Sequence, residues 1–193
     1  MEKERRENES KTGKSGLAED FVTSEELLEW TRAMVAIPSY SGRKDQEAGV
    51  GRYIKEIFDR EGIECRIAPL KDGRCNVYAR LPGKGGGRSL LLNGHMDTVP
   101  AYGMEKAYEP WTDENGFLHG RGTSDMKGPL AAMMGAVIAL KRSGAILGGD
   151  LIFCGVADEE GASLGTVHML KDGIRADAAI VGEALGPGAI GIA

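Results

Sequence analysis

The chain has 193 residues, a formal net charge of −5 at pH 7, and 41% hydrophobic and 27% charged residues. This composition is typical of a globular protein, and the length suffices for one domain with a sizeable core. No basic stripe with interleaved aromatic residues is present, so we expect no nucleic-acid partner. The longest apolar run, 129–140, is too short to span a bilayer, and the first residues form no apolar leader. With three cysteines and no CxxC pair, we expect a cytoplasmic protein without a membrane partner.

The first 20 residues are polar and mixed in charge, with almost no apolar residue before Leu17. Such a segment buries too little surface to offset the chain entropy lost on ordering. We therefore expect a disordered polar tail over 1–20 and the folded unit over 21–193. The sequence TGKS at 12–15 is similar to the end of a phosphate-binding loop. However, Asn8 stands where the loop needs glycine, and no apolar strand precedes it, so we assign no nucleotide site there.

Helices and short apolar strands alternate from residue 23 onward. Thr23 and Glu26 predict a capping box at the start of a helix that ends before Pro38. Further helices are expected over 45–61, 128–142 and 163–171. Strands are expected over 63–68, 75–81, 89–93, 151–156 and 178–181. This alternation predicts an α/β fold in which helices cover a largely parallel sheet.

Three of the predicted strands run directly into potential metal ligands. Strand 89–93 leads to His95 and Asp97, strand 151–156 leads to the acidic run 158–160, and strand 178–181 leads to Glu183. Ligands of open α/β sheets bind beyond the carboxyl ends of the strands, so these side chains converge if the strands are parallel neighbours. A glycine-rich loop over 120–128 could bring Asp125 to the same edge.

One imidazole among several carboxylates is a donor set suited to zinc, manganese or cobalt. Clustered carboxylates repel one another unless a cation neutralises them. Two metal ions bridged by a carboxylate are a known arrangement for hydrolysis of peptide-type bonds, with a further carboxylate accepting the proton of the attacking water. Each motif by itself leaves alternatives open: a structural histidine, a solvated acidic turn, or a glycine-rich loop that binds phosphate.

Four motifs together resemble the M20 metallopeptidases, the family of acetylornithine deacetylase, succinyl-diaminopimelate desuccinylase, aminoacylase and glutamate carboxypeptidase. They are GHMDTVP (94–100), GRGTSDMKG (120–128), DEE (158–160) and VGE (181–183). The resemblance implies a zinc-peptidase-like three-layer sandwich with a largely parallel central sheet. It also implies a hydrolase that cleaves the amide bond of an N-acyl amino acid or small peptide through a metal-bridging water.

Carried over residue by residue, the resemblance implies two divalent metal ions, zinc first, with cobalt or manganese as alternatives. Asp125 would bridge both ions, and Glu159 would act as general base on the bridging water. Asp97 would hold the imidazole of the histidine ligand. The complete set of metal ligands implied is His95, Asp125, Glu160 and Glu183.

The sequence also departs from the family pattern. Family members carry a further histidine ligand near their C-terminus and an inserted lid domain through which they dimerise. This sequence ends at Ala193, where the lid would begin, so we expect the N-terminal portion of a catalytic domain, with an exposed sheet edge. We expect weak or absent activity, with metal held chiefly by His95, Asp125 and Glu183.

Two other function classes stay open. A non-catalytic metal-binding or interaction module could derive from the same fold. A phosphate or nucleotide binder is less favoured, because the acidic cluster would repel phosphate.

A few further residues have two interpretations. Lys127 either neutralises nearby acids or is a surface lysine at the start of a helix. Trp111 and Tyr108 either line the site or cover the core. We interpret His119 as structural and expect His168 to lie exposed within a helix.

Overall fold

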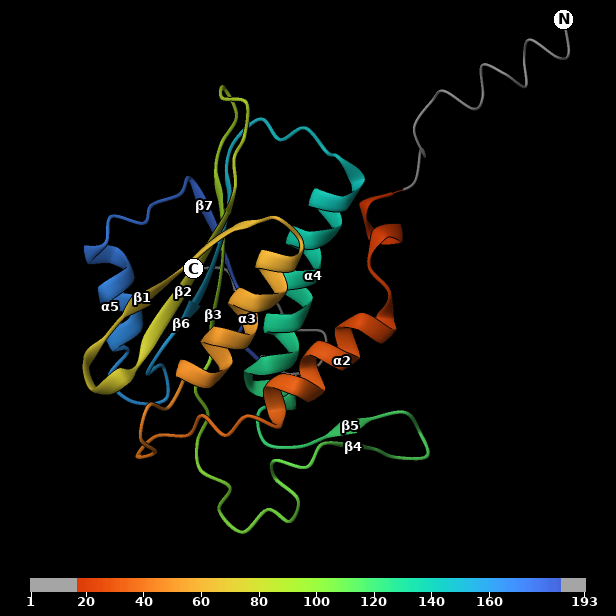
Figure 1. Cartoon of the computed structure of the whole chain (residues 1–193), viewed down its shortest axis with the longest axis vertical. Coiled ribbons are helices and arrows are strands. Elements are labelled where there is room, and N and C mark those ends of the chain that lie inside the picture. Colours follow the sequence, from red (N-terminus) through yellow and green to blue (C-terminus); the bar gives the residue numbers. More distant parts are fainter. Residues whose placement is uncertain (1–16, 185–193) are drawn as a thin grey trace, which may run out of the picture.

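A five-stranded mixed sheet forms the centre of the molecule (Figure 1). The computed structural model describes residues 17–184. The strand order across the sheet is β1-β2-β6-β3-β7. Neighbours β1/β2 and β2/β6 are antiparallel, whereas β6/β3 and β3/β7 are parallel, so β2 alone opposes the direction of the other four strands. The bounds are β1 Glu64–Pro69, β2 Cys75–Leu81, β3 Leu90–His95, β6 Leu151–Val156 and β7 Ala178–Val181.

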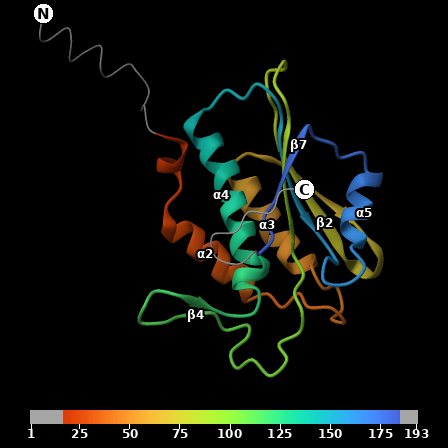
Figure 2. The ribbon, with the colours of Figure 1, turned by 180° about the vertical axis from the view of Figure 1, so that it is seen from behind.

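Helices cover both faces of this sheet, which confirms the predicted three-layer α/β architecture (Figures 1 and 2). One face carries α3 (Ala48–Arg60) and α4 (Gly128–Ser143), with α2 (Ser24–Val35) packed against α4. The other face carries α5 (Leu164–Lys171). The largely parallel sheet was also predicted correctly, with β2 as the exception.

Alternating side chains of the strands supply the two cores. On β2, Val77 belongs to the core under α3 and α4, whereas its neighbour Tyr78 faces the smaller core under α5. The same alternation separates Phe153 from Cys154 on β6. Phe58 of α3 packs edge-on against Phe153, with ring centroids 5.2 Å apart. Successive side chains of these strands therefore enter different cores, which explains why the sequences of buried strands are continuously apolar.

The predicted capping box at the start of α2 is present. The Thr23 amide donates to Glu26 Oε2 at 2.8 Å, and the Glu26 amide donates to Thr23 Oγ1 at 3.2 Å. The reciprocal bonds satisfy two amides that have no partner within the helix.

The fold begins a few residues earlier than the expected boundary at 21. A 3-10 helix, Ala18–Phe21, packs against α4. Arg142 of α4 donates to the carbonyl of Phe21 at 2.9 Å. These contacts involve backbone groups, which the polar composition of the segment does not reveal. Residues 1–16, including TGKS at 12–15, lie outside the described residues.

A short two-stranded ribbon was not predicted. It consists of β4 (Trp111–Thr112) and β5 (Leu118–His119), which pair antiparallel. Asp113 closes its turn, because Oδ1 accepts the amides of Asn115 and Phe117, both at 2.9 Å. Strands of two residues are too short to show an alternating pattern in the sequence.

At one edge of the sheet, β7 pairs with β3 on its inner side. Ile180 and Val181 are 52% and 59% exposed. Among the described residues, β7 is therefore an outer strand of the sheet with exposed apolar side chains. No helix among those residues is both long and apolar enough to cross a membrane.

Gly165 allows α5 to approach the chain segment that follows β6. Its amide donates to the Ala157 carbonyl at 2.9 Å, and its carbonyl accepts from Asn76 Nδ2 at 2.8 Å. Asn76 Oδ1 in turn accepts the Ala157 amide at 3.0 Å. This buried network fixes the start of the turn that carries the acidic run.

Gly165→Ala should destabilise the protein, because the new Cβ would lie 2.3 Å from the Ala157 amide nitrogen. We expect the free energy of unfolding to fall by about 1–3 kcal/mol, measured by denaturant titration. Val167→Ala, at an exposed position of the same helix, is the control and should change it by less than about 0.5 kcal/mol. Equal stability of the two variants would contradict a tight contact at Gly165.

Candidate metal centre

The carboxyl ends of β3, β6 and β7 lie at one edge of the sheet (Figure 1). His95 is the last residue of β3, and Glu183 lies two residues beyond β7. Glu159 and Glu160 lie in the turn after β6. Asp125 comes from the loop before α4, in the segment Thr123–Lys127, and its peptide bond to Met126 is cis.

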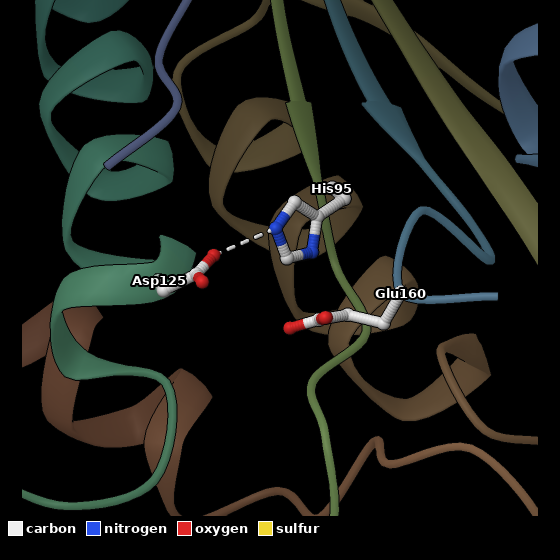
Figure 3. Close-up of side chains that lie close together, drawn as sticks. All are labelled: His95, Asp125 and Glu160. Atoms are coloured by element: carbon white, nitrogen blue, oxygen red, sulfur yellow. Dashed lines mark hydrogen bonds and ion pairs between the residues drawn. The ribbon is translucent and has the colours of Figure 1, made fainter. Parts of the chain in front are cut away.

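The imidazole of His95 lies at the centre of this group. Its Nε2 is 2.9 Å from Asp125 Oδ1, 3.8 Å from Glu183 Oε2 and 4.0 Å from Glu159 Oε2. Figure 3 shows the ring between Asp125 and Glu160. One ligand atom from each of these three residues lies within 4.8 Å of the others. The structure therefore brings together every residue that the sequence predicted for the site, while their roles stay predictions.

Asp97 makes contacts that the sequence did not predict. Its buried carboxylate accepts the amide of Glu159 through Oδ1 and that of Glu160 through Oδ2, both at 3.1 Å. The carboxylate Oδ1 is 3.5 Å from His95 Nδ1, whereas the backbone carbonyl of Asp97 is only 3.0 Å from it. Asp97 thus holds the imidazole mainly through its backbone, and its side chain holds the acidic turn.

This geometry determines which ring nitrogen of His95 carries the proton. A carbonyl oxygen can only accept, so Nδ1 carries the proton shared with Asp97. In the neutral imidazole, Nε2 then keeps its lone pair toward the acidic cluster. A histidine ligand held by a second hydrogen bond on its other nitrogen is the usual arrangement in metal sites.

The electrostatics of the group are dominated by negative charge. Burial opposes the charged form of His95, but Asp97 and Asp125 outweigh it and raise its pKa to about 9. Burial, with the charge of Asp125, raises the pKa of Glu160. Burial also raises the pKa of Glu183, assisted by the same aspartate. The cluster therefore favours additional positive charge, which is the property of a cation site.

The donor set fits a divalent cation. It offers one imidazole nitrogen and carboxylate oxygens, the ligands that zinc, cobalt and manganese accept. The side chains of Asp125, Glu159 and Glu183 are 50%, 45% and 39% exposed, so an ion can reach the carboxylates from solvent.

Lys127 is buried, so its interpretation as a surface lysine is wrong. Its Nζ donates to the carbonyls of Met34 and Ile37, both at 2.9 Å. Burial lowers its pKa to about 7, and the charge of Asp97 acts in the opposite direction. The lysine thereby ties the loop of Asp125 to the end of α2. The sequence offered no periodic pattern from which to predict this role.

Tyr108 and Trp111, in the segment between His95 and Asp125, each stack on another ring. Tyr108 stacks on Tyr40 with ring centroids 5.8 Å apart. Trp111 stacks on His119 at 4.4 Å, and His119 Nε2 lies 2.9 Å from Asp113 Oδ2. His119 therefore has the structural role that we expected, in support of the ribbon.

Asp97→Asn should destabilise the protein even without metal. The asparagine side chain offers one oxygen to two amide donors, so one partly buried donor loses its acceptor. We expect the free energy of unfolding of chelator-treated protein to fall by about 1–3 kcal/mol. Asp59→Asn, which removes an exposed pair with Lys55, should cost less than about 1 kcal/mol. Equal losses would show that the bonds to the acidic turn contribute nothing.

Comparison with known proteins identifies relatives for most of the chain. A LysW-lysine/LysW-ornithine hydrolase of Pyrococcus furiosus is 38% identical over 172 residues, covering 89% of this chain and 45% of the relative. A succinyl-diaminopimelate desuccinylase of Staphylococcus epidermidis is 33% identical over 157 residues, covering 79% of this chain and 38% of the relative. The chain thus spans less than half the length of these curated relatives.

Solved structures share the fold. A tripeptidase of Staphylococcus aureus superposes with a TM-score of 0.70 at 22% identity, over 86% of this chain and 45% of that one. For human carnosine dipeptidase 1 the TM-score is 0.69 at 22% identity, over 84% and 39%. A dinuclear metal-binding M20 peptidase of Bacillus subtilis gives 0.56 at 21% identity, over 77% and 39%.

The sequence model of peptidase family M20/M25/M40 matches residues 91–192, which are more than half of the chain. This span contains every residue of the candidate metal centre. The match agrees with the curated relatives and with the shared fold, and the chain therefore belongs to peptidase family M20/M25/M40.

Proposed function

We propose that this chain carries the metal centre of a dinuclear, metal-dependent amide hydrolase acting on N-acylated amino acids or small peptides. The observation that carries the proposal is the position of His95, whose Nε2 lies within 4.0 Å of carboxylate oxygens from three different segments. The family of the chain and the metal-binding peptidase among its structural neighbours support the same chemistry.

The proposal assigns a role to each metal-binding residue of the site. His95, Asp125, Glu160 and Glu183 would hold two divalent ions, with zinc as the first choice and cobalt or manganese as alternatives. Ions bound there would act as Lewis acids on the amide carbonyl and on the attacking water. Asp125, whose Oδ1 is the carboxylate oxygen nearest to His95 Nε2, would be the ligand shared by the two ions.

Glu159 is the proposed general base. It is half-exposed, and its carboxylate lies at the border of the cluster, 4.0 Å from His95 Nε2. Its backbone amide is fixed by Asp97, so the side chain extends from a rigid turn. A carboxylate in this position can accept a proton from the attacking water and return it to the departing amine.

The substrate class follows from what the relatives have in common. The names of the two curated relatives describe a succinylated diamino acid and lysine or ornithine joined to LysW. A bond that such compounds can share is an amide on an amino group of an amino acid. We therefore propose a small N-acyl amino acid or peptide as substrate. The net charge of −5 and the acidic cluster disfavour nucleic acid.

In a protein that contains this chain at the full length of its relatives, Glu159→Gln should reduce turnover of N-acyl amino acids by about 10²–10⁴-fold, because it removes the proton acceptor while keeping the side-chain shape. Metal content, measured by elemental analysis, should stay unchanged. Glu64→Gln, an exposed carboxylate on β1, is the control and should leave turnover unchanged. Full turnover by the Glu159 variant would refute the assigned base.

In the same full-length protein, removal of metal should abolish activity, and addition of zinc, cobalt or manganese should restore it. The same ions should raise the melting temperature of chelator-treated protein, because they bind the folded state. His95→Ala should eliminate most of this shift. If phosphate rather than metal raised the melting temperature, the glycine-rich loop would instead be a phosphate site and the proposal would fail.

A further inference from the structure

A buried ion triad adjoins the turn that carries Glu159 and Glu160, and it is composed of Glu47, Arg74 and Asp158. Arg74 Nε donates to Glu47 Oε2 at 2.9 Å, and Nη2 donates to Glu47 Oε1 at 2.5 Å. Its Nη1 donates to Asp158 Oδ1 at 2.9 Å. The side chain of Glu47 is fully buried, and those of Arg74 and Asp158 are 11% and 10% exposed. One guanidinium therefore compensates two carboxylates that have little access to water.

The triad holds Asp158 from both its backbone and its side chain. The Asp158 amide donates to Glu47 Oε1 at 3.1 Å. Its carboxylate Oδ2 accepts the amides of Ala162 at 3.1 Å and Leu164 at 3.4 Å. Asp158 adopts a left-handed conformation with φ of 65°, which a non-glycine residue keeps only when its surroundings enforce it. Asp158 is thus the anchor of the turn between β6 and α5.

The two residues after this anchor are the predicted base and metal ligand. The amides of Glu159 and Glu160 donate to Asp97, and the preceding amide, of Asp158, donates to Glu47. Three consecutive amides of the turn thus donate to two buried carboxylates. Asp97 also contacts His95. The hydrogen bonds of Glu47 and Arg74 to the turn, in contrast, are made at Asp158.

We propose that Arg74, supported by Glu47, is a positioning residue that sets the direction of Glu159 and Glu160 toward the metal centre. The inference rests on the proposed function, since it assumes that Glu160 binds metal. Its physical basis is the cost of buried charge. Without the guanidinium, the carboxylates of Glu47 and Asp158 repel each other in a dry environment. Asp158 would then turn toward water and release the turn that carries the two glutamates.

The test replaces Arg74 by lysine in the purified protein. Lysine keeps the charge but cannot form the planar fork that reaches both carboxylates. Cobalt titration, followed by calorimetry and visible absorption, measures the affinity and geometry of each bound ion. Hydrogen exchange of residues 157–164 measures the order of the turn in chelator-treated protein. Arg80→Lys is the matched control, because Arg80 lies on β2, the strand that begins directly after Arg74, and forms an exposed pair with Asp150.

We expect Arg74→Lys to weaken the more weakly held cobalt ion by about 10–100-fold, to change its visible spectrum, and to accelerate exchange in 157–164. Arg80→Lys should alter none of these. Glu47→Gln is the second variant if Arg74→Lys fails to fold, and its effects should have the same direction. A merely structural role for Arg74 would lower the melting temperature without changing the cobalt spectrum.

Three results would overturn the inference. The first is unchanged cobalt affinity in both the Arg74 and the Glu47 variants. The second is faster exchange of the turn with unchanged cobalt binding, which would make the triad a stabilising element only. The third is absence of cobalt binding by the unchanged protein and by Arg80→Lys, which would refute the proposed function itself and the inference with it.

Discussion

The hydrogen bonds from the amides of Glu159 and Glu160 to Asp97 are the interaction on which the candidate centre depends. They join the end of β3 to the turn after β6, two segments 62 and 63 residues apart in the chain. A hydrogen bond to a carboxylate is stronger than one to a neutral acceptor, and burial keeps water from competing for the carboxylate. Because Asp97 also contacts His95, the imidazole and the acidic turn are positioned by the same residue.

The parallel register of the sheet places the remaining ligands. His95 pairs with Val156, and Asn93 pairs with Val181, so β3, β6 and β7 end at nearly the same level. Residues just beyond those ends must meet at one edge. Asp125 lies 2.9 Å from the imidazole, and the buried Lys127 helps to hold its loop against the end of α2.

Much of this arrangement could be predicted from the sequence, because it depends on local patterns. The apolar strands, the capping box at Thr23 and the acids after the strands are all visible in the order of residues. The buried charges were not visible. Glu47, Arg74 and Lys127 look like surface residues, and only partners about 27 to 93 residues away explain their burial. The ribbon of β4 and β5 was not predicted, because its two-residue strands show no alternating pattern. Its turn is closed by hydrogen bonds to Asp113.

The distribution of positive charge gives a final reason why the edge of the sheet suits metal ions. Arg74 and Lys127 lie close to the site, but their donors are committed to Glu47, Asp158 and backbone carbonyls. Among residues 17–184, no lysine or arginine forms an ion pair with the four half-exposed acids that surround His95, namely Asp125, Glu159, Glu160 and Glu183. One imidazole cannot balance four carboxylates. The protein uses its cations to hold the framework and leaves the front of the cluster negative, which is the electrostatic basis of the proposed metal site.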